Sequence, residues 1–461
     1  MGVDFSYNFR VHLSISMEKN TAPITNLTRA LGKLDSTALV IGTVIGTGVF
    51  LKTAPMSQIL GSPQLVLLAW VAAGILSLMG ALVYAELGGM FPKAGGEFVY
   101  LQKAYGDSAG FLYGWQRFWI GSPGSIAAYA VGAAAFAKGA AELSPSGEKY
   151  LALGIVLTFT ALNCLTVKFG GRLQSFLTIL KMLLVIGLAL AALAFSSTGS
   201  WAHLSQSDST IQFTWSGFGV AMIAALWAFD GWNNLPMAAG EVNKPEKTLP
   251  FALIWGTIGI LLIYGMANVG YFYALPFENI VGDSTLPVAT RAAETFLGSN
   301  GVVILSLAFV ISAVGAMNGS ILTGARVPYA MAQEKLFPQF LAKLSAKSHV
   351  PYVSVLLQGF WACALALSGT FEMLTDWVVF SSWIFYGLCG FSVIHFRRKN
   401  PNLARPYRVP FFPILPIIFC LMSLALLGNS LYTMPKQSVL GLLFILSGLP
   451  VYWWTRIRKK N

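Results

Sequence analysis

Charged residues are scarce in this chain. Only 10% of its 461 residues are Asp, Glu, Lys or Arg, whereas 56% are hydrophobic. Ordinary soluble domains carry about a quarter charged residues, so this composition excludes a soluble globular protein. Apolar runs of at least about 18 residues, the length that crosses roughly 30 Å of hydrocarbon, recur from residue 35 onward. The sequence therefore predicts an all-α polytopic membrane protein.

Histidine and cysteine are also rare, with four residues of each. The histidines lie in tails, loops or helix ends, and the sequence contains neither an HExxH motif nor an acid dyad, so an intramembrane enzyme, a metal site and a cofactor are not expected. The cysteines lie in or beside apolar runs, and we expect them to be reduced. Rings of charge and repeated filter motifs are missing too, which argues against a selective channel. The residues concerned are His12, His203, His349, His395, Cys164, Cys363, Cys389 and Cys420.

The apolar runs predict twelve membrane spans. No soluble domain fits between them, and residues 1–34 and the end of the chain are left as tails. A nutrient sensor built on such a membrane domain is a further possibility, although sensors usually have longer tails. The predicted spans are 35–60, 64–90, 105–137, 149–168, 172–196, 215–240, 250–275, 297–332, 352–369, 374–396, 411–430 and 438–457.

The net charge of +12 reflects topology rather than nucleic-acid binding. Lys and Arg gather in the two tails and in alternate loops, for example Arg397 to Lys399, while the loops 197–214 and 370–376 contain almost none. This bias predicts that both termini face the cytoplasm of a cell-membrane protein. A basic surface interleaved with aromatics, as nucleic acid would require, is not apparent.

The first predicted span contains IGTVIGTGVF at residues 41–50. Glycine costs about 1 kcal/mol relative to alanine inside a helix. Gly42 and Gly46 could simply allow close packing of another helix. Alternatively, the helix unwinds around Gly46-Thr47-Gly48, which is tolerated at membrane depth only where the backbone lines a cavity or is buried in protein.

A second interruption favours unwinding. The sixth span contains LWAFDGWNNLPMAAGE at residues 226–241, in which Asp230, Gly231, two asparagines and Pro236 cannot form a regular lipid-facing helix. Paired interruptions in corresponding positions of two halves indicate an inverted-repeat transporter and its substrate site.

At these residues the sequence resembles the amino acid–polyamine–organocation superfamily and, within it, the L-type amino acid transporters. The resemblance covers nearly the whole chain after residue 30. It rests on the ordered set VIGTVIGTGVF (40–50), YAELGGMFPKAGGEFVYL (84–101), LWAFDGWNNL (226–235), EVNKPEKTLP (241–250), NGSILTGARVPYAMAQEKLFP (318–338), HFRRKNPNLARPYRVP (395–410) and LFILSGLPVYWW (443–454).

This resemblance implies a LeuT-like fold with two inverted five-helix repeats and broken helices 1 and 6. The transport core would be residues 35–396, with spans 1–5 in about 35–196 and spans 6–10 in about 215–396; residues 397–461 would form helices 11 and 12 and a cytoplasmic tail. Members carry L-amino acids by alternating access, commonly as sodium-independent exchangers. Animal members pair with a glycoprotein through a cysteine between spans 3 and 4; KGAAELSPSGEKYL has none, so we expect no disulfide-linked heavy chain.

An amino acid zwitterion needs partners for both of its charges, since burying either one unpaired costs several kcal/mol. Backbone N–H groups at the start of the second half-helix suit the carboxylate. Carbonyls at the ends of the first half-helices suit the ammonium. The predicted substrate-binding residues are Val44, Ile45, Gly46, Thr47, Gly48 and Val49 in span 1, and Trp227, Ala228 and Asp230 in span 6.

Trp227 matches the position of a family aromatic that closes over substrate, so it is the predicted gate; the alternative is a packing aromatic. Lys181 lies about nine residues, or roughly 13 Å, from the inner end of span 5. The resemblance implies that its ammonium replaces a sodium ion. The expected partners are carbonyls of span 1 near Gly42, together with Ser312 or Asn318 on span 8. Snorkelling to the interface is the alternative.

Asp230 and Lys181 are the two ionisable residues placed nearest the membrane midplane. Asp230 either caps the second half of span 6 or attracts a substrate ammonium. Glu86, Glu241 and Arg326 lie near predicted cytoplasmic helix ends and form either inner-gate ion pairs or solvated termini. The function expected is sodium-independent exchange of small-to-medium neutral L-amino acids. A broad neutral/dibasic exchanger and a proton-coupled permease are the alternatives.

Overall fold

The computed structural model describes residues 27–137, 143–165, 167–282 and 286–458. Most of the predicted N-terminal tail and the last three residues lie outside these ranges. The described residues are helical and contain no strand, only one isolated parallel bridge between Leu31 and Val242. The prediction of an all-helical fold is confirmed.

The first half of the chain follows the predicted spans closely. Proline and a hydroxyl cap start several of these helices; Ser62, for example, precedes Pro63 and accepts a hydrogen bond from the N–H of Leu65. A π-helical turn, η1 (Arg117–Gly121), interrupts span 3 between α6 and α7. The helices are α1 (Lys33–Val44), α2 (Gly48–Leu51), α3 (Thr53–Leu60), α4 (Pro63–Met90), α5 (Glu97–Tyr105), α6 (Asp107–Gln116), α7 (Ser122–Ala137), α8 (Pro145–Asn163) and α9 (Val167–Phe195).

The second half begins with the short 3₁₀ turn η2 (Trp201–Ser205). The eighth predicted span corresponds to the part of α14 after Gly298 together with α15. A separate helical stretch precedes it, because α14 begins at Val288 and bends at Gly298, whose φ is +62°. The remaining elements are α10 (Trp215–Phe229), α11 (Asn234–Met237), η3 (Ala239–Glu241), α12 (Pro245–Ala274), α13 (Phe277–Val281), α14 (Val288–Gly324), α15 (Arg326–Gln333), η4 (Gln339–Ala342), α16 (Tyr352–Ser368), α17 (Phe371–Lys399), α18 (Ile414–Thr433), α19 (Pro435–Leu446) and α20 (Gly448–Arg458).

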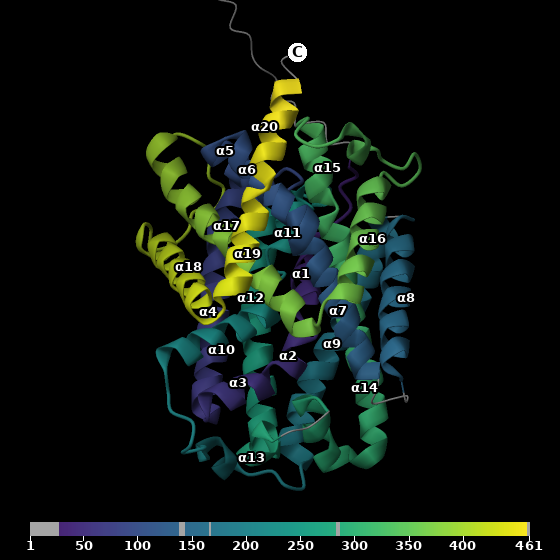
Figure 1. The fold of residues 1–461 in the computed structure, drawn as a ribbon, viewed down its shortest axis with the longest axis vertical. Coiled ribbons are helices and arrows are strands. Elements are labelled where there is room, and N and C mark those ends of the chain that lie inside the picture. The colour runs from purple at the N-terminus through teal and green to yellow at the C-terminus, as the bar shows by residue number, and fades with distance from the viewer. Residues whose placement is uncertain (1–26, 138–142, 166, 283–285, 459–461) are drawn as a thin grey trace, which may run out of the picture.

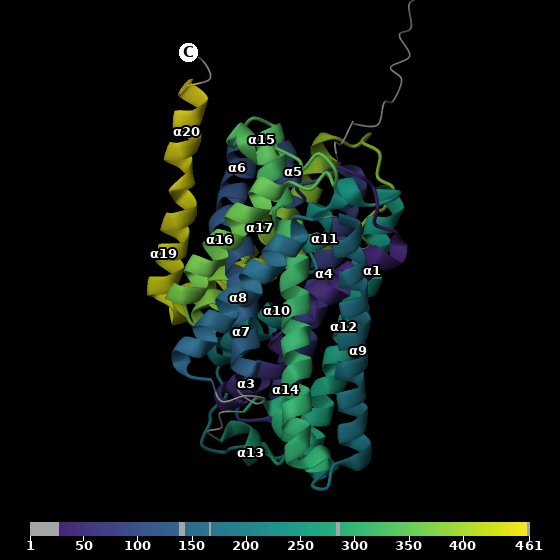
Figure 2. The same ribbon diagram turned by 90° about the vertical axis from the view of Figure 1, so that its right-hand side faces the viewer.

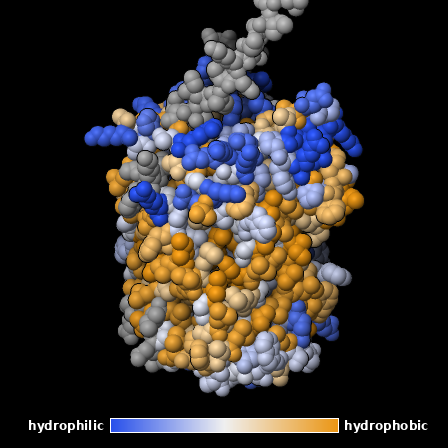
Figure 3. Space-filling view, turned by 180° about the vertical axis from the view of Figure 1, so that it is seen from behind, coloured by the Kyte–Doolittle hydropathy of each residue, from blue (hydrophilic) through white to orange (hydrophobic). Residues whose placement is uncertain are grey.

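Long apolar helices make this a multi-pass membrane protein. Nine helical stretches of the described residues are long and apolar enough to cross a bilayer, and α10 and α16 are shorter apolar helices. Hydrophobic side chains cover the middle of the molecule, and hydrophilic ones gather toward the end from which α20 projects (Figure 3). Such a band is what a hydrocarbon layer requires of the surface it contacts.

The interrupted helices occupy the interior of the bundle. The helices α9, α12 and α14 run along its long axis, while α19 and α20 lie at one edge (Figures 1 and 2). The α1 helix packs against α9, α12 and α14, and α10 packs against α2, α3, α4 and α17. Both interruptions are therefore enclosed by protein, the condition under which unwound backbone is tolerated at membrane depth.

Candidate functional site

The first interruption separates α1 from α2. The helix ends at Val44, and Ile45 turns away from helical geometry with ψ of 97°. The first hydrogen bonds of the next helix run from Phe50 and Leu51 N–H to the carbonyl of Thr47, both at 3.2 Å. The N–H groups of Thr47, Gly48 and Val49 thus lie ahead of the bonded turn, where a helix leaves donors for other partners.

Glycine is required here by close approach. A Cβ atom on Gly48 would lie 2.5 Å from the Cα of Ala228, and one on Gly46 would lie 2.7 Å from the ring of Tyr129. Neither distance is possible for real atoms, and the Gly48 neighbour is backbone that cannot rotate aside. Packing and unwinding, the two interpretations of these glycines, therefore both apply.

The second interruption separates α10 from α11. The first helix ends at Phe229, Asp230 is extended with ψ of 147°, and Gly231 has φ of +109°. Only glycine adopts this φ readily. Gly231 also lies against the first interrupted helix, since a Cβ there would approach the carbonyl oxygen of Thr43 to 3.0 Å.

Hydrogen bonds join the two interruptions directly. Thr43 Oγ1 lies 3.0 Å from the carbonyl of Gly231 and 2.8 Å from that of Leu39, and the two carbonyls share its one proton. The hydroxyl of Tyr264, on α12, lies 3.0 Å from the carbonyl of Val44 and 2.9 Å from that of Ala228. Because a hydroxyl has one proton, it can serve only one of these acceptors at a time. The carbonyl that it does not serve is available to another donor.

Trp227 lies beside this junction. Its ring centroid is 5.4 Å from that of Tyr129 and 6.2 Å from that of Phe371, the first residue of α17. The indole N–H of Trp227 and the hydroxyl of Thr47 are both buried. No described residue forms a hydrogen bond with either of them. Buried polar groups are normally satisfied, so these two are donors that a polar ligand or water would satisfy.

Lys181 reaches the first interruption from α9. Its ammonium donates to the carbonyls of Gly42 at 2.5 Å, Ile45 at 2.6 Å and Ser312 at 3.2 Å, and the residue is only 1% exposed. The alternative that Lys181 snorkels to the interface is wrong. The ammonium lies where the carbonyls at the end of α1 converge, which is also where a helix carries partial negative charge.

Two predicted partners need correction. Asn318 is not a partner of Lys181: its amide donates to Gln174 at 2.9 Å and accepts from Asn163 at 2.8 Å. The carbonyl of Ile45, predicted to face the substrate ammonium, is instead bound by Lys181. Position along the span predicts depth but not which side of the helix a group faces, and both errors arise from that.

Asp230 accepts a hydrogen bond from the hydroxyl of Tyr386, on α17, at 2.8 Å. The alternative that it caps the second half of span 6 is wrong, because α11 starts from Asn233 and has no side-chain cap among the described residues. Asp230 is 6% exposed and lies at the end of α10, next to the Ala228 carbonyl.

The three charged residues predicted near helix ends form buried ion pairs rather than solvated termini. Glu241 receives two hydrogen bonds from Arg326, at 2.8 and 3.2 Å. Glu86 receives two from Arg397, at 2.6 and 3.0 Å, and a third from the N–H of Val409. Both pairs have bidentate geometry and connect elements far apart in sequence. Glu241–Arg326 is fully buried, and Glu86 is buried against a partly exposed Arg397.

Sequence reasoning missed three charged residues near the interruptions. Lys52, between α2 and α3, is 2% exposed and pairs with Glu372. Arg117, in the π turn, and Glu97, at the start of α5, are 2% and 0% exposed and bond to residues of the second interruption. A signal for Arg117 was available, because it lies well inside the third predicted span and an intramembrane charge marks a functional position by default.

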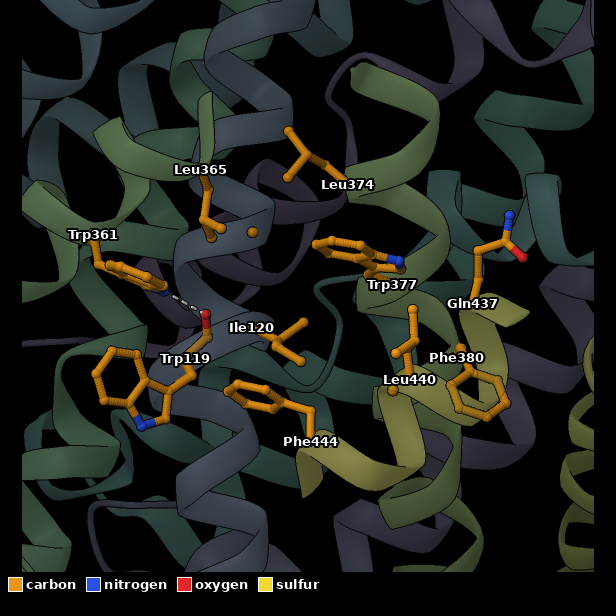
Figure 4. A pocket seen from close by; sticks show the side chains of 12 residues that line it. Trp119, Ile120, Trp361, Leu365, Leu374, Trp377, Phe380, Gln437, Leu440 and Phe444 are labelled. Carbon is orange, nitrogen blue, oxygen red and sulfur yellow. Dashed lines mark hydrogen bonds between the residues drawn. The ribbon is translucent and has the colours of Figure 1, made fainter. Parts of the chain in front are cut away.

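A separate apolar pocket of about 290 Å³ lies between α7, α16, α17 and α19 (Figure 4). The indoles of Trp119, Trp361 and Trp377 line it, and Trp361 donates to the carbonyl of Trp119 at 2.7 Å. Gln437 is the polar side chain at its rim. Such a lining cannot match the two charges of a zwitterion, so this pocket is not the candidate substrate site.

The amino acid permease family model matches residues 31–455. The chain is 32% identical over 438 residues to the serine/threonine exchanger SteT of Bacillus subtilis, covering 94% of this chain and 98% of that one. It is 31% identical to the b(0,+)-type amino acid transporter 1 of Mus musculus, covering 93% and 88%, and 28% identical to the human cystine/glutamate transporter, covering 93% and 85%. The resemblance seen in the sequence is thereby confirmed, and the chain belongs to the amino acid permease family of membrane transporters.

Proposed function

We propose that this protein exchanges small-to-medium neutral L-amino acids across the cell membrane by alternating access, without sodium. The observation that carries the proposal is the meeting of two interrupted helices, one offering free N–H groups at its start and the other offering carbonyls at its end. The serine/threonine exchanger to which the chain is similar supports the same class of substrate.

In the proposed complex, the carboxylate binds the N–H groups of Thr47, Gly48 and Val49, with the unpartnered hydroxyl of Thr47 as a further donor. The absence of a side chain at Gly46 and Gly48 lets the ligand approach the backbone. The ammonium binds carbonyls around Val44, Trp227 and Ala228, and the carboxylate of Asp230 adds attraction. A cage made largely of backbone recognises what all amino acids share.

Lys181 supplies the fixed positive charge that supports sodium independence in this proposal. Its ammonium binds three carbonyls around the first interruption, as a bound cation would. The sodium-site surrogate therefore consists of Lys181, Gly42, Ile45 and Ser312, without Asn318. Stimulation of uptake by sodium would contradict this part of the proposal.

The proposed architecture has twelve crossings, with α1–α9 and α10–α17 as two inverted repeats and both termini in the cytoplasm. Positive residues in alternate loops support this orientation. The buried pairs Glu241–Arg326 and Glu86–Arg397 would hold the cytoplasmic side closed, and Trp227 would close over the substrate from the other side. No cofactor and no disulfide-linked subunit is needed.

Exchange in proteoliposomes tests the proposal. Vesicles loaded with unlabelled L-serine should take up labelled L-serine or L-alanine, while empty vesicles should not, and replacing sodium by choline should leave the rate unchanged. Uptake that is equal in loaded and empty vesicles would contradict exchange. The Asp230–Tyr386 pair favours a second candidate, a neutral/dibasic exchanger, and competition by L-lysine or L-arginine in the same assay would reveal it.

A further inference from the structure

Two adjacent asparagines of the second interruption are held by charges of opposite sign. The side-chain amide of Asn233 donates to Glu97 Oε1 at 2.5 Å. The next residue, Asn234, accepts at its Oδ1 from Arg117 Nη2 at 2.6 Å. The carboxylate therefore takes a donor from one asparagine, and the guanidinium takes an acceptor from the other.

Both charges come from elements other than the interrupted helix. Arg117 belongs to the π turn η1, a kind of local distortion that often accompanies functional sites. Glu97 opens α5, just after a loop in which Gly95 N–H donates to the carbonyl of Met237 at 2.9 Å. Met237 ends α11. That short helix is therefore held at one end by Glu97, through Asn233, and at the other end by the loop that precedes Glu97.

Glu97 and Arg117 each bind an asparagine, and no direct ion pair joins the two charges. Glu97, Arg117, Asn233 and Asn234 are each at most 2% exposed. An ion pair requires a nitrogen and a carboxylate oxygen within about 4 Å of each other. Among the described residues, no carboxylate oxygen lies that close to a nitrogen of Arg117. Burying two charges that do not pair is costly, so packing alone does not account for them. Asn233 ends the unwound turn that follows Asp230, and Asn234 begins α11.

We propose that Glu97 and Arg117 are positioning residues that fix the second interruption in its substrate-binding conformation. They act through Asn233 and Asn234, and neither contacts the substrate. By fixing both side-chain amides, they set the turn that directs the Ala228 carbonyl and the Asp230 carboxylate. The inference rests on the proposed function and extends it to residues outside the substrate cage.

The two asparagines bind charges of opposite sign, so the same substitution, asparagine to aspartate, should have different effects at the two positions. Asn233→Asp removes the donor and places a second carboxylate against Glu97. Asn234→Asp keeps the acceptor and places a carboxylate on Arg117, where it gains an ion pair. We expect Asn233→Asp to raise the apparent KM for L-serine exchange by about tenfold or more, and Asn234→Asp to change it by less than about threefold.

Exchanging donor and acceptor provides the rescue. Glu97→Gln alone retains a carbonyl acceptor for Asn233 and should stay within about threefold of wild type. In the double variant Glu97→Gln/Asn233→Asp, the glutamine amide donates to the new aspartate, and KM should return to the value of Glu97→Gln. A purely structural loss of folded protein would lower Vmax without moving KM.

Midpoints of thermal unfolding of the purified variants, measured without substrate, complete the test. Asn233→Asp should lower the midpoint and the double variant should restore it. Equal effects of the two aspartates, or no recovery in the double variant, would overturn the inference even if wild type exchanges L-serine. A wild type that exchanges no amino acid, with the unfolding pattern intact, would overturn the proposed function and the positioning role while leaving the two amide contacts supported.

Discussion

The two interruptions meet at one point but are stabilised in different ways. The first, Ile45 to Thr47, has no charged side chain of its own. Lys181 binds the carbonyl of Ile45, and the hydroxyls of Tyr264 and Tyr129 bind the carbonyls of Val44 and Thr43 at the end of α1. The second, Asp230 to Asn233, has polar side chains that bind Tyr386 and Glu97. One break is held by its backbone and the other by its side chains.

This difference separates two tasks that a transporter of zwitterions must perform. A break held through its backbone presents groups common to every residue, so it suits the part that all amino acids share. A break held through side chains can be tuned by substitution, so it suits selection among amino acids. Variants that affect the first break should therefore reduce exchange of all substrates, while variants at the second should discriminate among them.

The largest effect is expected from Lys181→Met. Removing the ammonium leaves the carbonyls of Gly42, Ile45 and Ser312 without their buried partner, and losing one side of such a contact is strongly destabilising. Exchange of L-serine and L-alanine should both fall by at least about 100-fold. Lys103→Met, which removes an exposed lysine from α5, is the control and should leave both rates unchanged. Retained exchange in Lys181→Met would contradict the role given to the first break.

Gly48→Ala should come next. The added methyl group would collide with the backbone of Ala228 and push the two breaks apart. Overpacking of this kind costs about 1–3 kcal/mol, so exchange of every substrate should fall by about 10- to 100-fold. Gly187→Ala is the matched control, because a Cβ on that glycine of α9 meets nothing within 4 Å. Equal behaviour of the two variants would show that the breaks need not touch.

Trp227→Ala tests the ring that borders the second break. Losing the ring leaves the space between Tyr129 and Phe371 open to water, so the substrate can no longer be occluded. Uptake per inserted protein should fall about tenfold, whereas expression should change little. Trp227→Phe should retain most of the uptake. Unchanged uptake in Trp227→Ala would remove its gating role.

The smallest overall effect, and the most selective, is expected from Asp230→Asn. The amide still accepts a hydrogen bond from Tyr386 but loses the charge that attracts a cationic side chain. Competition by L-lysine or L-arginine should weaken by about tenfold, while exchange of L-alanine should change less than about threefold. Equal losses for alanine and lysine would mean that Asp230 binds the α-ammonium. Both interruptions would then recognise the part that all amino acids share, and neither would select among them.

Composition and hydrophobic runs were sufficient to predict the helical membrane fold, and glycine, proline and asparagine marked both interruptions. The contacts of Lys181 with Gly42 and Ser312 agree with the expectation drawn from the resemblance. The partner of Asp230, the separation of Asn318 from Lys181 and the bond of Ile45 to Lys181 could not be predicted, because each depends on helix rotation. Such rotations are set by packing among segments more than one hundred residues apart, and a local pattern carries no information about them.

The partners of Arg117 and Glu97 could not be predicted from the sequence either. Neither residue was singled out from the sequence, and their partners, Asn234 and Asn233, lie 117 and 136 positions away in the chain. Nothing in QRFW or GGEF indicates which distant amide each would bind. Charged residues inside predicted spans are therefore worth recording even when no partner is evident.

A structure determined with bound L-serine tests the central claim most directly. The account predicts the carboxylate about 3 Å from the N–H groups of Thr47, Gly48 and Val49, and the ammonium at the carbonyls of Val44 and Ala228. A ligand bound elsewhere, with both stretches wound into continuous α-helix, would contradict it.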